Sequence, residues 1–182
     1  MDKRRQLDPL ESTSVFLEER PTVARTDARA GKYLIFRLAA EEFGIRVLSV
    51  REIMGVQDIT AVPRTPSYVK GVINLRGKVI PVVDLRLKFG LPEVEYTPRT
   101  CIVVVQVGAG AGSMPMGIVV DGVVEVLNVA AADIVDTPDF GREATTSYLL
   151  GMAKNKGRVK ILLDIDQVLS SQEVHGLESV PV

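Results

Sequence analysis

The chain has 182 residues, enough for one compact unit with an appendage. Its 22 Lys and Arg nearly balance 23 Asp and Glu, and this net charge of −1 argues against a nucleic-acid-binding surface, which needs clustered positive charge. Aromatic residues are only 5%, without a Trp, so base-stacking platforms and sugar-binding grooves are not expected. The core must come mainly from Val, Ile and Leu, which favours strands.

Residues 1–30 read as a mostly disordered extension, because charges of both signs alternate there without a sustained apolar period. We expect this extension to add nothing to stability. From Lys32 onward the residue pattern changes. A strand at 33–38, a turn and a partner at 43–47 predict a hairpin, and we then expect a short helix at 48–54 and a short strand at 59–62.

The next segment predicts a second hairpin, with strands at 69–75 and 79–83 around a tight turn in which Gly77 takes positive φ. Asp84 is placed to cap a short helix at 85–89. The stretch 100–120 lacks charge and is long enough to cross a membrane, but four glycines and Pro115 divide it into two strands and a loop.

The last predicted elements are a strand at 158–163 and a helix at 164–171, followed by a tail at 173–182. Cys101 and His175 are the only residues of their kinds in the sequence, which excludes an intramolecular disulfide and a thiolate zinc site. Nothing in the sequence brings two carboxylates together as an acid and a base. We therefore predict no enzyme activity, no cofactor and no metal. Without a secretory signal or a spanning segment, we also predict a cytoplasmic location.

A repeat organises the chain. The pattern containing Tyr68, Gly71 and Asp84 returns 80 positions later at Tyr148, Gly151 and Asp164. An upstream block, Gly44 to Ile53, returns at a spacing of 73 as Gly117 to Val126. The repeat predicts a mainly β fold of two small five-stranded barrels with short helices, the first at about 31–90, the second at about 98–163, with strand exchange possible between them. A partner helix would lie in a groove between the barrels.

The two halves differ at the tip of one hairpin, where Arg76 of the first half corresponds to Lys156 of the second. Arginine can hold a carboxylate through two hydrogen bonds, whereas lysine cannot. Glu52, on the predicted helix, is the candidate acceptor. Two interpretations stay open: the pair shapes a binding surface, or Arg76 is an ordinary exposed hairpin residue.

Three segments carry a family resemblance: the block from Tyr68 to Leu85 with Asn74-Leu75-Arg76-Gly77 at its centre, Val50 to Ile53, and Gly117 to Asp121. They resemble CheW, the bacterial chemotaxis coupling family, over residues 31–172. The resemblance implies two SH3-like barrels and a non-catalytic adaptor. Its implied partners are the regulatory domain of a CheA-type histidine kinase and the cytoplasmic tip of a methyl-accepting chemoreceptor, with no nucleic acid and no direct membrane insertion.

By match to the family pattern, seven residues are predicted to bind partners: Val50, Glu52, Ile53, Gly71, Arg76, Gly117 and Val120. The apolar members would accept a helix stripe, while Glu52 and Arg76 fix its orientation. The alternatives are a CheW-like regulatory module of another kinase pathway and, from other classes, a small β-barrel nucleic-acid-binding module or a small β-barrel enzyme.

Overall fold

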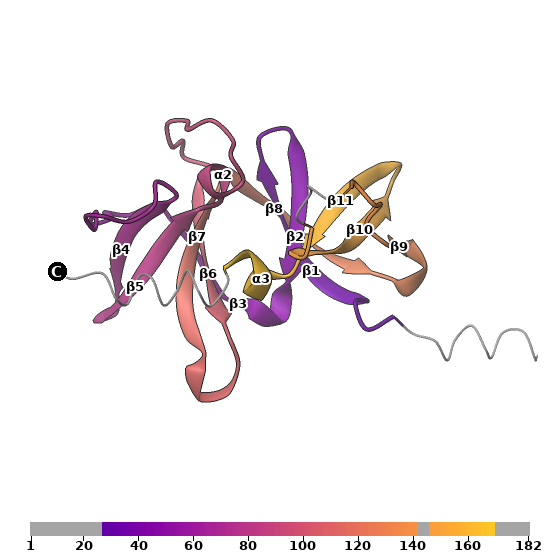
Figure 1. The fold of residues 1–182 in the computed structure, drawn as a ribbon, viewed down its shortest axis with the longest axis horizontal. Helices are drawn as coiled ribbons and strands as arrows, with labels where there is room; N and C mark the ends of the chain where they lie inside the picture. Colours follow the sequence, from indigo (N-terminus) through magenta and orange to yellow (C-terminus); the bar gives the residue numbers. More distant parts are fainter. Residues whose placement is uncertain (1–26, 142–145, 170–182) are drawn as a thin grey trace, which may run out of the picture.

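The computed structural model describes residues 27–141 and 146–169, which form two β-sheets side by side along the long axis (Figure 1). The five-stranded sheet, here the first barrel, has the order β3-β6-β7-β5-β4. Its strands are β3 (Val50–Gly55), β4 (Val69–Leu75), β5 (Lys78–Asp84), β6 (Cys101–Val107) and β7 (Met114–Val120).

The six-stranded sheet, here the second barrel, has the order β8-β1-β2-β11-β10-β9. Its strands are β1 (Gly31–Leu38), β2 (Glu41–Arg46), β8 (Gly122–Val129), β9 (Ile134–Val135), β10 (Leu149–Asn155) and β11 (Arg158–Leu163). The helical elements are short: α2 (Leu85–Lys88), α3 (Ile165–Val168), and the 3-10 turns η2 (Val47–Ser49), η3 (Gly110–Gly112) and η4 (Ala131–Asp133).

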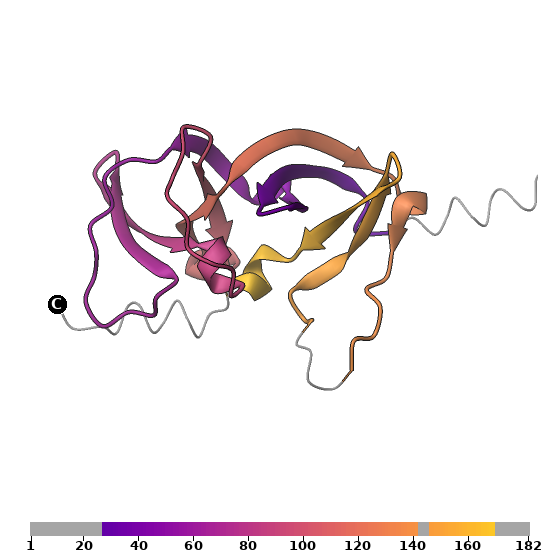
Figure 2. The ribbon, with the colours of Figure 1, turned by 90° about the horizontal axis from the view of Figure 1, so that it is seen from above.

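Each barrel takes its first hairpin from the other repeat, as Figure 2 shows for the indigo β1–β2 hairpin beside the orange and yellow strands. Hairpin β1–β2 pairs with β8 and, in parallel, with β11, while β6–β7 pairs with β3 and, in parallel, with β5. The sheets therefore do not follow the expected boundaries 31–90 and 98–163. One barrel spans 50–120, and the other combines 31–46 with 122–163.

The short connections explain this exchange. Only Asp121 separates β7 from β8. To stay in its own sheet beside β6, β8 would have to run parallel to β7, and a parallel neighbour needs a crossover of a dozen or more residues. The chain therefore continues straight into the other barrel. Asp121 also joins the two bodies, since its carboxylate accepts hydrogen bonds from the Ala39 amide at 2.7 Å and from Arg86 Nη1 at 2.6 Å.

Several local predictions are confirmed and two are wrong. The hairpins form as expected, and the Asp84 carboxylate caps α2 by accepting from the amides of Arg86 and Leu87. The helix predicted at 48–54 is instead η2 followed by strand β3, because pairing with β6 outweighs local preference. The strand predicted at 59–62 is reduced to a single bridge between Thr60 and Val72. The predicted C-terminal helix begins after Asp164 but ends at Val168, and residues 170–182 lie outside the described residues.

One hydrophobic cluster spans both barrels, while two smaller clusters lie one in each barrel. The shared cluster draws Leu34, Phe36 and Ile45 from the second barrel and Val83, Val103 and Ile118 from the first. A run of stacked rings, Phe36–Phe43–Phe89–Tyr148, with centroids 5.6–6.1 Å apart, crosses the same region. Because interiors are close-packed, this cluster makes the two barrels one mechanical unit.

A buried ion pair holds the exchanged hairpin to the second barrel. Lys160 on β11 donates to the Glu42 carboxylate on β2, and their side chains are only 7% and 9% exposed. Arg37 reaches the other Glu42 oxygen at 3.2 Å. The hydrogen bond from Lys160 is the main reason that the pKa of Glu42 is lowered. The equivalent position in the first barrel holds Ile80, which is apolar and buried.

We expect Lys160→Met to lower the free energy of unfolding by about 3–5 kcal/mol, because it leaves the Glu42 carboxylate buried without its main partner. Urea unfolding at neutral pH measures the change. Lys154→Met, at an exposed position of β10, is the matched control. Glu42→Leu with Lys160→Ile, which imitates the apolar first barrel, should recover most of the loss. If Lys160→Met and Lys154→Met are equally stable, the buried pair has no structural weight.

Candidate functional site

The turn between β4 and β5 presents Arg76 at the tip of a tight hairpin. Arg76 and Gly77 both have positive φ, 51° and 85°, and the Gly77 amide donates to Asn74 Oδ1 at 2.8 Å. This is the two-residue turn whose twist matches the flanking strands. The geometry lifts the Arg76 side chain out of the sheet, where 74% of its surface is exposed.

Arg76 holds Glu52 through both guanidinium nitrogens. Nη1 donates to Oε1 at 2.6 Å and Nη2 donates to Oε2 at 2.9 Å. The predicted ion pair is therefore confirmed, although Glu52 lies on strand β3 and not on a helix. Hydrogen bonding to Arg76 lowers the pKa of Glu52 and raises that of Arg76, so the pair is charged at neutral pH.

The pair crosses the seam where the two edge strands of the first barrel, β3 and β4, approach each other. Gln57 Nε2 also spans the seam by donating to the Asn74 carbonyl at 3.4 Å, and Thr60 exchanges backbone hydrogen bonds with Val72 at 2.9 Å. An exposed ion pair contributes little to folding stability, so these backbone hydrogen bonds and the hydrophobic core hold the first barrel closed. The charges of Glu52 and Arg76 thus remain available at the surface.

Two apolar residues close to the pair in the sequence are exposed. Ile53, next to Glu52 on β3, is 44% exposed, and Val79, three residues after Arg76, is 66% exposed. Val50 lies half-buried against the shared core. The sequence analysis included Val50 and Ile53 but missed Val79. The sequence carries no signal for this exposure, and the structure shows it in both halves, since Val159, the counterpart of Val79 in the repeat, is 51% exposed. We call Glu52, Ile53, Arg76 and Val79 the seam patch.

Three of the predicted binding residues are buried inside the first barrel. Val120 is 0% exposed. Gly117 is buried in β7, where an added Cβ would lie 2.9 Å from Ile102 Cγ2. Gly71 is buried in β4 with φ of 138°, and an added Cβ would lie 1.9 Å from the Thr60 carbonyl oxygen. Their burial favours a role in shaping the barrel, and contact of these three residues with a partner stays a prediction.

Comparison with known proteins adds the family. A model described as a CheW-like domain matches residues 32–173. A chemotaxis protein CheW from Klebsiella aerogenes is 41% identical over 149 residues, covering 82% of this chain and 87% of the relative. Another from Rhizobium meliloti is 40% identical over 144 residues, covering 79% and 90%. The chain belongs to the CheW family.

A solved CheW structure agrees with the architecture. The scaffolding protein TtCheW from Thermoanaerobacter tengcongensis matches with a TM-score of 0.69 and 30% identity, covering 79% of this chain and 95% of that one. The predicted fold class, two SH3-like barrels, is confirmed. CheW-family proteins are non-catalytic scaffolds of chemotaxis, so the prediction that the chain is no enzyme is confirmed as well.

A metal-ligand cluster and a membrane-spanning helix are both absent from the part of the chain that the structure describes. Within residues 27–141 and 146–169, no cluster of three or more His, Cys, Asp or Glu side chains is placed to hold a metal ion. No helix of the same ranges is long and apolar enough to cross a membrane.

Proposed function

We propose that this chain is an adaptor that couples the cytoplasmic tips of chemoreceptors to a CheA-type histidine kinase. Membership of a scaffold family supports the general role. The observation that carries the assignment to a surface is the bidentate Glu52–Arg76 pair, which is accessible at the surface, with the exposed apolar residues Ile53 and Val79 close to it in the sequence. Such a patch offers both burial and orientation to a partner.

The seam patch fits a helical or strand-edge partner with an apolar stripe flanked by polar groups. Ile53 and Val79 would receive the stripe, and the charges of Glu52 and Arg76 would fix its direction, because hydrogen bonds to charged groups are lost if the partner rotates. The kinase would bind through its CheW-like regulatory domain, and the receptor tip through a groove between the barrels. In this arrangement the protein is cytoplasmic and reaches the membrane only through receptor complexes.

The shared core supports coupling as the mechanism. Because Phe36, Phe43, Phe89 and Tyr148 stack across the junction, the barrels move as one body. A partner bound to one barrel is then held in fixed geometry relative to a partner bound to the other. A small displacement of the receptor tip would bias the conformational equilibrium of the kinase, without any chemistry on this chain.

A pull-down tests the proposal directly. The full chain is offered a CheA regulatory domain and a receptor-tip fragment, first separately and then together. We expect each to be retained alone and all three to be recovered as one complex. If the two partners compete, or if neither is retained, the adaptor function is wrong.

A further inference from the structure

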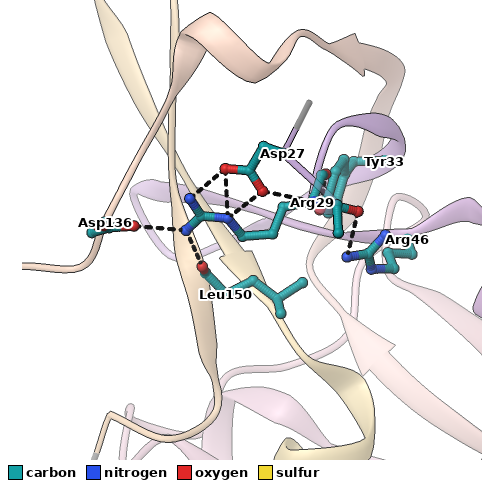
Figure 3. Close-up of polar contacts among 7 residues, drawn as sticks. Asp27, Arg29, Tyr33, Arg46, Asp136 and Leu150 are labelled. Carbon is teal, nitrogen blue, oxygen red and sulfur yellow. Dashed lines mark hydrogen bonds and ion pairs between the residues drawn. The ribbon is translucent and has the colours of Figure 1, made fainter. Parts of the chain in front are cut away.

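The described chain begins with a short turn, residues 27–30, that lies on the second barrel (Figure 3). Arg29 Nη1 donates to the Leu150 carbonyl at 2.8 Å and lies 3.1 Å from the Asp136 carboxylate. Nε donates to both Asp27 oxygens, at 2.9 and 3.0 Å, and Nη2 donates to Oδ2 at 2.5 Å. The guanidinium therefore connects the turn to the start of β10 and to the residue after β9.

The backbone of the same turn is also held. The hydroxyl of Tyr33, a fully buried residue, donates to the Arg29 carbonyl at 2.6 Å. Arg46 Nη2 donates to the Ala28 carbonyl at 3.3 Å, and the Ala30 amide donates to the Asp27 carbonyl at 3.0 Å. Residues 27–30 were expected to belong to a disordered extension without effect on stability. The expected disorder is wrong for these four residues, whereas their effect on stability stays a prediction. Residues 1–26 lie outside the described residues.

The position of Leu150 in the sheet explains why its carbonyl accepts a hydrogen bond from Arg29. The register of β10 against β11 shifts between Leu149 and Gly151, which leaves Leu150 outside the ladder. A partly buried carbonyl in that position needs another donor, and Arg29 provides it. Gly151 leaves the necessary space, since a Cβ there would lie 2.8 Å from Arg29 Nη1 and 2.9 Å from the Val135 carbonyl oxygen.

The first barrel repeats part of this arrangement, because Thr60 bridges Val72 and lies against Gly71 as Val135 pairs with Met152 and lies against Gly151. The difference is the side-chain contact across the edge strands, which in the first barrel is the Glu52–Arg76 pair. The counterparts of that pair are Glu125 and Lys156, both described, and the structure records no ion pair between them. The second barrel thus has an arginine from the N-terminal turn where the first barrel uses its own hairpin.

We propose that residues 27–30 form a strap that closes the second barrel, with Arg29 as its anchor and Leu150 as the group it serves. Arg29 is a positioning residue, and it lies before residue 32, where the family match begins. The hydrogen bonds from Arg29 hold the pKa of Asp27 at about 2, well below its ordinary value, so the carboxylate is charged at neutral pH. The proposal is independent of any partner of the seam patch.

Hydrogen exchange on the full chain tests the strap. In Arg29→Ala we expect amides of 149–152 to exchange on the order of tenfold faster, because a charge-assisted hydrogen bond across the barrel is lost. Amides of 101–107 in the first barrel should exchange as in the wild type. Arg29→Lys should be intermediate, since an ammonium can reach the Leu150 carbonyl but cannot also grip both Asp27 oxygens.

Truncations and a matched control complete the test. Deletion of 1–26 should leave exchange at 149–152 unchanged, whereas deletion of 1–30 should reproduce Arg29→Ala. Asp133→Asn, an acidic residue on the same segment as Asp136, is the control and should behave as the wild type. Wild-type exchange at 149–152 in Arg29→Ala, or equal acceleration in both barrels, would overturn the proposal.

Discussion

In Arg76→Glu, receptor-controlled kinase activity is expected to disappear while the protein stays folded. The substitution places a second carboxylate beside Glu52 and removes the donor of both hydrogen bonds, of 2.6 and 2.9 Å. The surface then presents two negative charges instead of an ion pair, and this mismatch with a partner that complements Arg76 opposes association strongly. We expect affinity for the partner at this patch to fall on the order of 30-fold or more. The melting temperature should move by no more than roughly 2 °C, because the Arg76 side chain is 74% exposed.

Matched variants separate a binding role from a structural one. Lys78→Glu makes the same charge reversal two residues away, at another exposed position of the hairpin, and should retain coupling. The double reversal Glu52→Arg with Arg76→Glu restores an ion pair with its ends exchanged. If the pair only braces the seam, the double variant recovers coupling; if it contacts the partner, coupling stays lost. A folded Arg76→Glu protein with normal coupling would show that the seam patch is not a docking site.

Local signals in the sequence were sufficient for the hairpins and the caps. The turn at Arg76 and Gly77 and the Asp84 cap depend on neighbours within a few residues, so their geometry could be predicted without the fold. The internal repeat extended these predictions to the Asp164 cap and to the β10–β11 hairpin of the second half. The pairing of Glu52 with Arg76 was one of two interpretations that the sequence left open, and the structure shows that the pair forms.

The errors arose where contacts distant in the sequence decide. Residues 48–54 have apolar positions compatible with a helix, and only the ladder between β3 and β6 makes a strand of them. The hairpin exchange was expected only as a possibility, because it depends on how far a one-residue link can reach, and a pattern of apolar residues does not encode this. Arg29 was assigned to a disordered segment because Leu150, its hydrogen-bond partner on β10, is 121 positions away.

Gly71→Ala is expected to be the most destabilising single-methyl change in the first barrel. Gly71 has φ of 138°, and an added Cβ would lie 1.9 Å from the Thr60 oxygen and 2.9 Å from Ala61 Cα. Both are backbone atoms, so the 60–61 segment must move and its bridge to Val72 is lost. The strained conformation should cost about 1–3 kcal/mol and the overlap at least as much again, measured as the free energy of unfolding in urea.

Gly31→Ala measures the backbone strain alone, because Gly31 has nearly the same φ, 145°, with nothing within 4 Å of an added Cβ. The difference between the two variants therefore measures the packing of the 60–61 segment against β4. If both lose the same stability, that segment yields freely and Gly71 is not a packing requirement. If Gly71→Ala instead folds with wild-type stability but loses its partner, Gly71 would act in binding itself. The geometry favours the scaffold role, because a buried glycine that faces Thr60 offers no surface to a second protein.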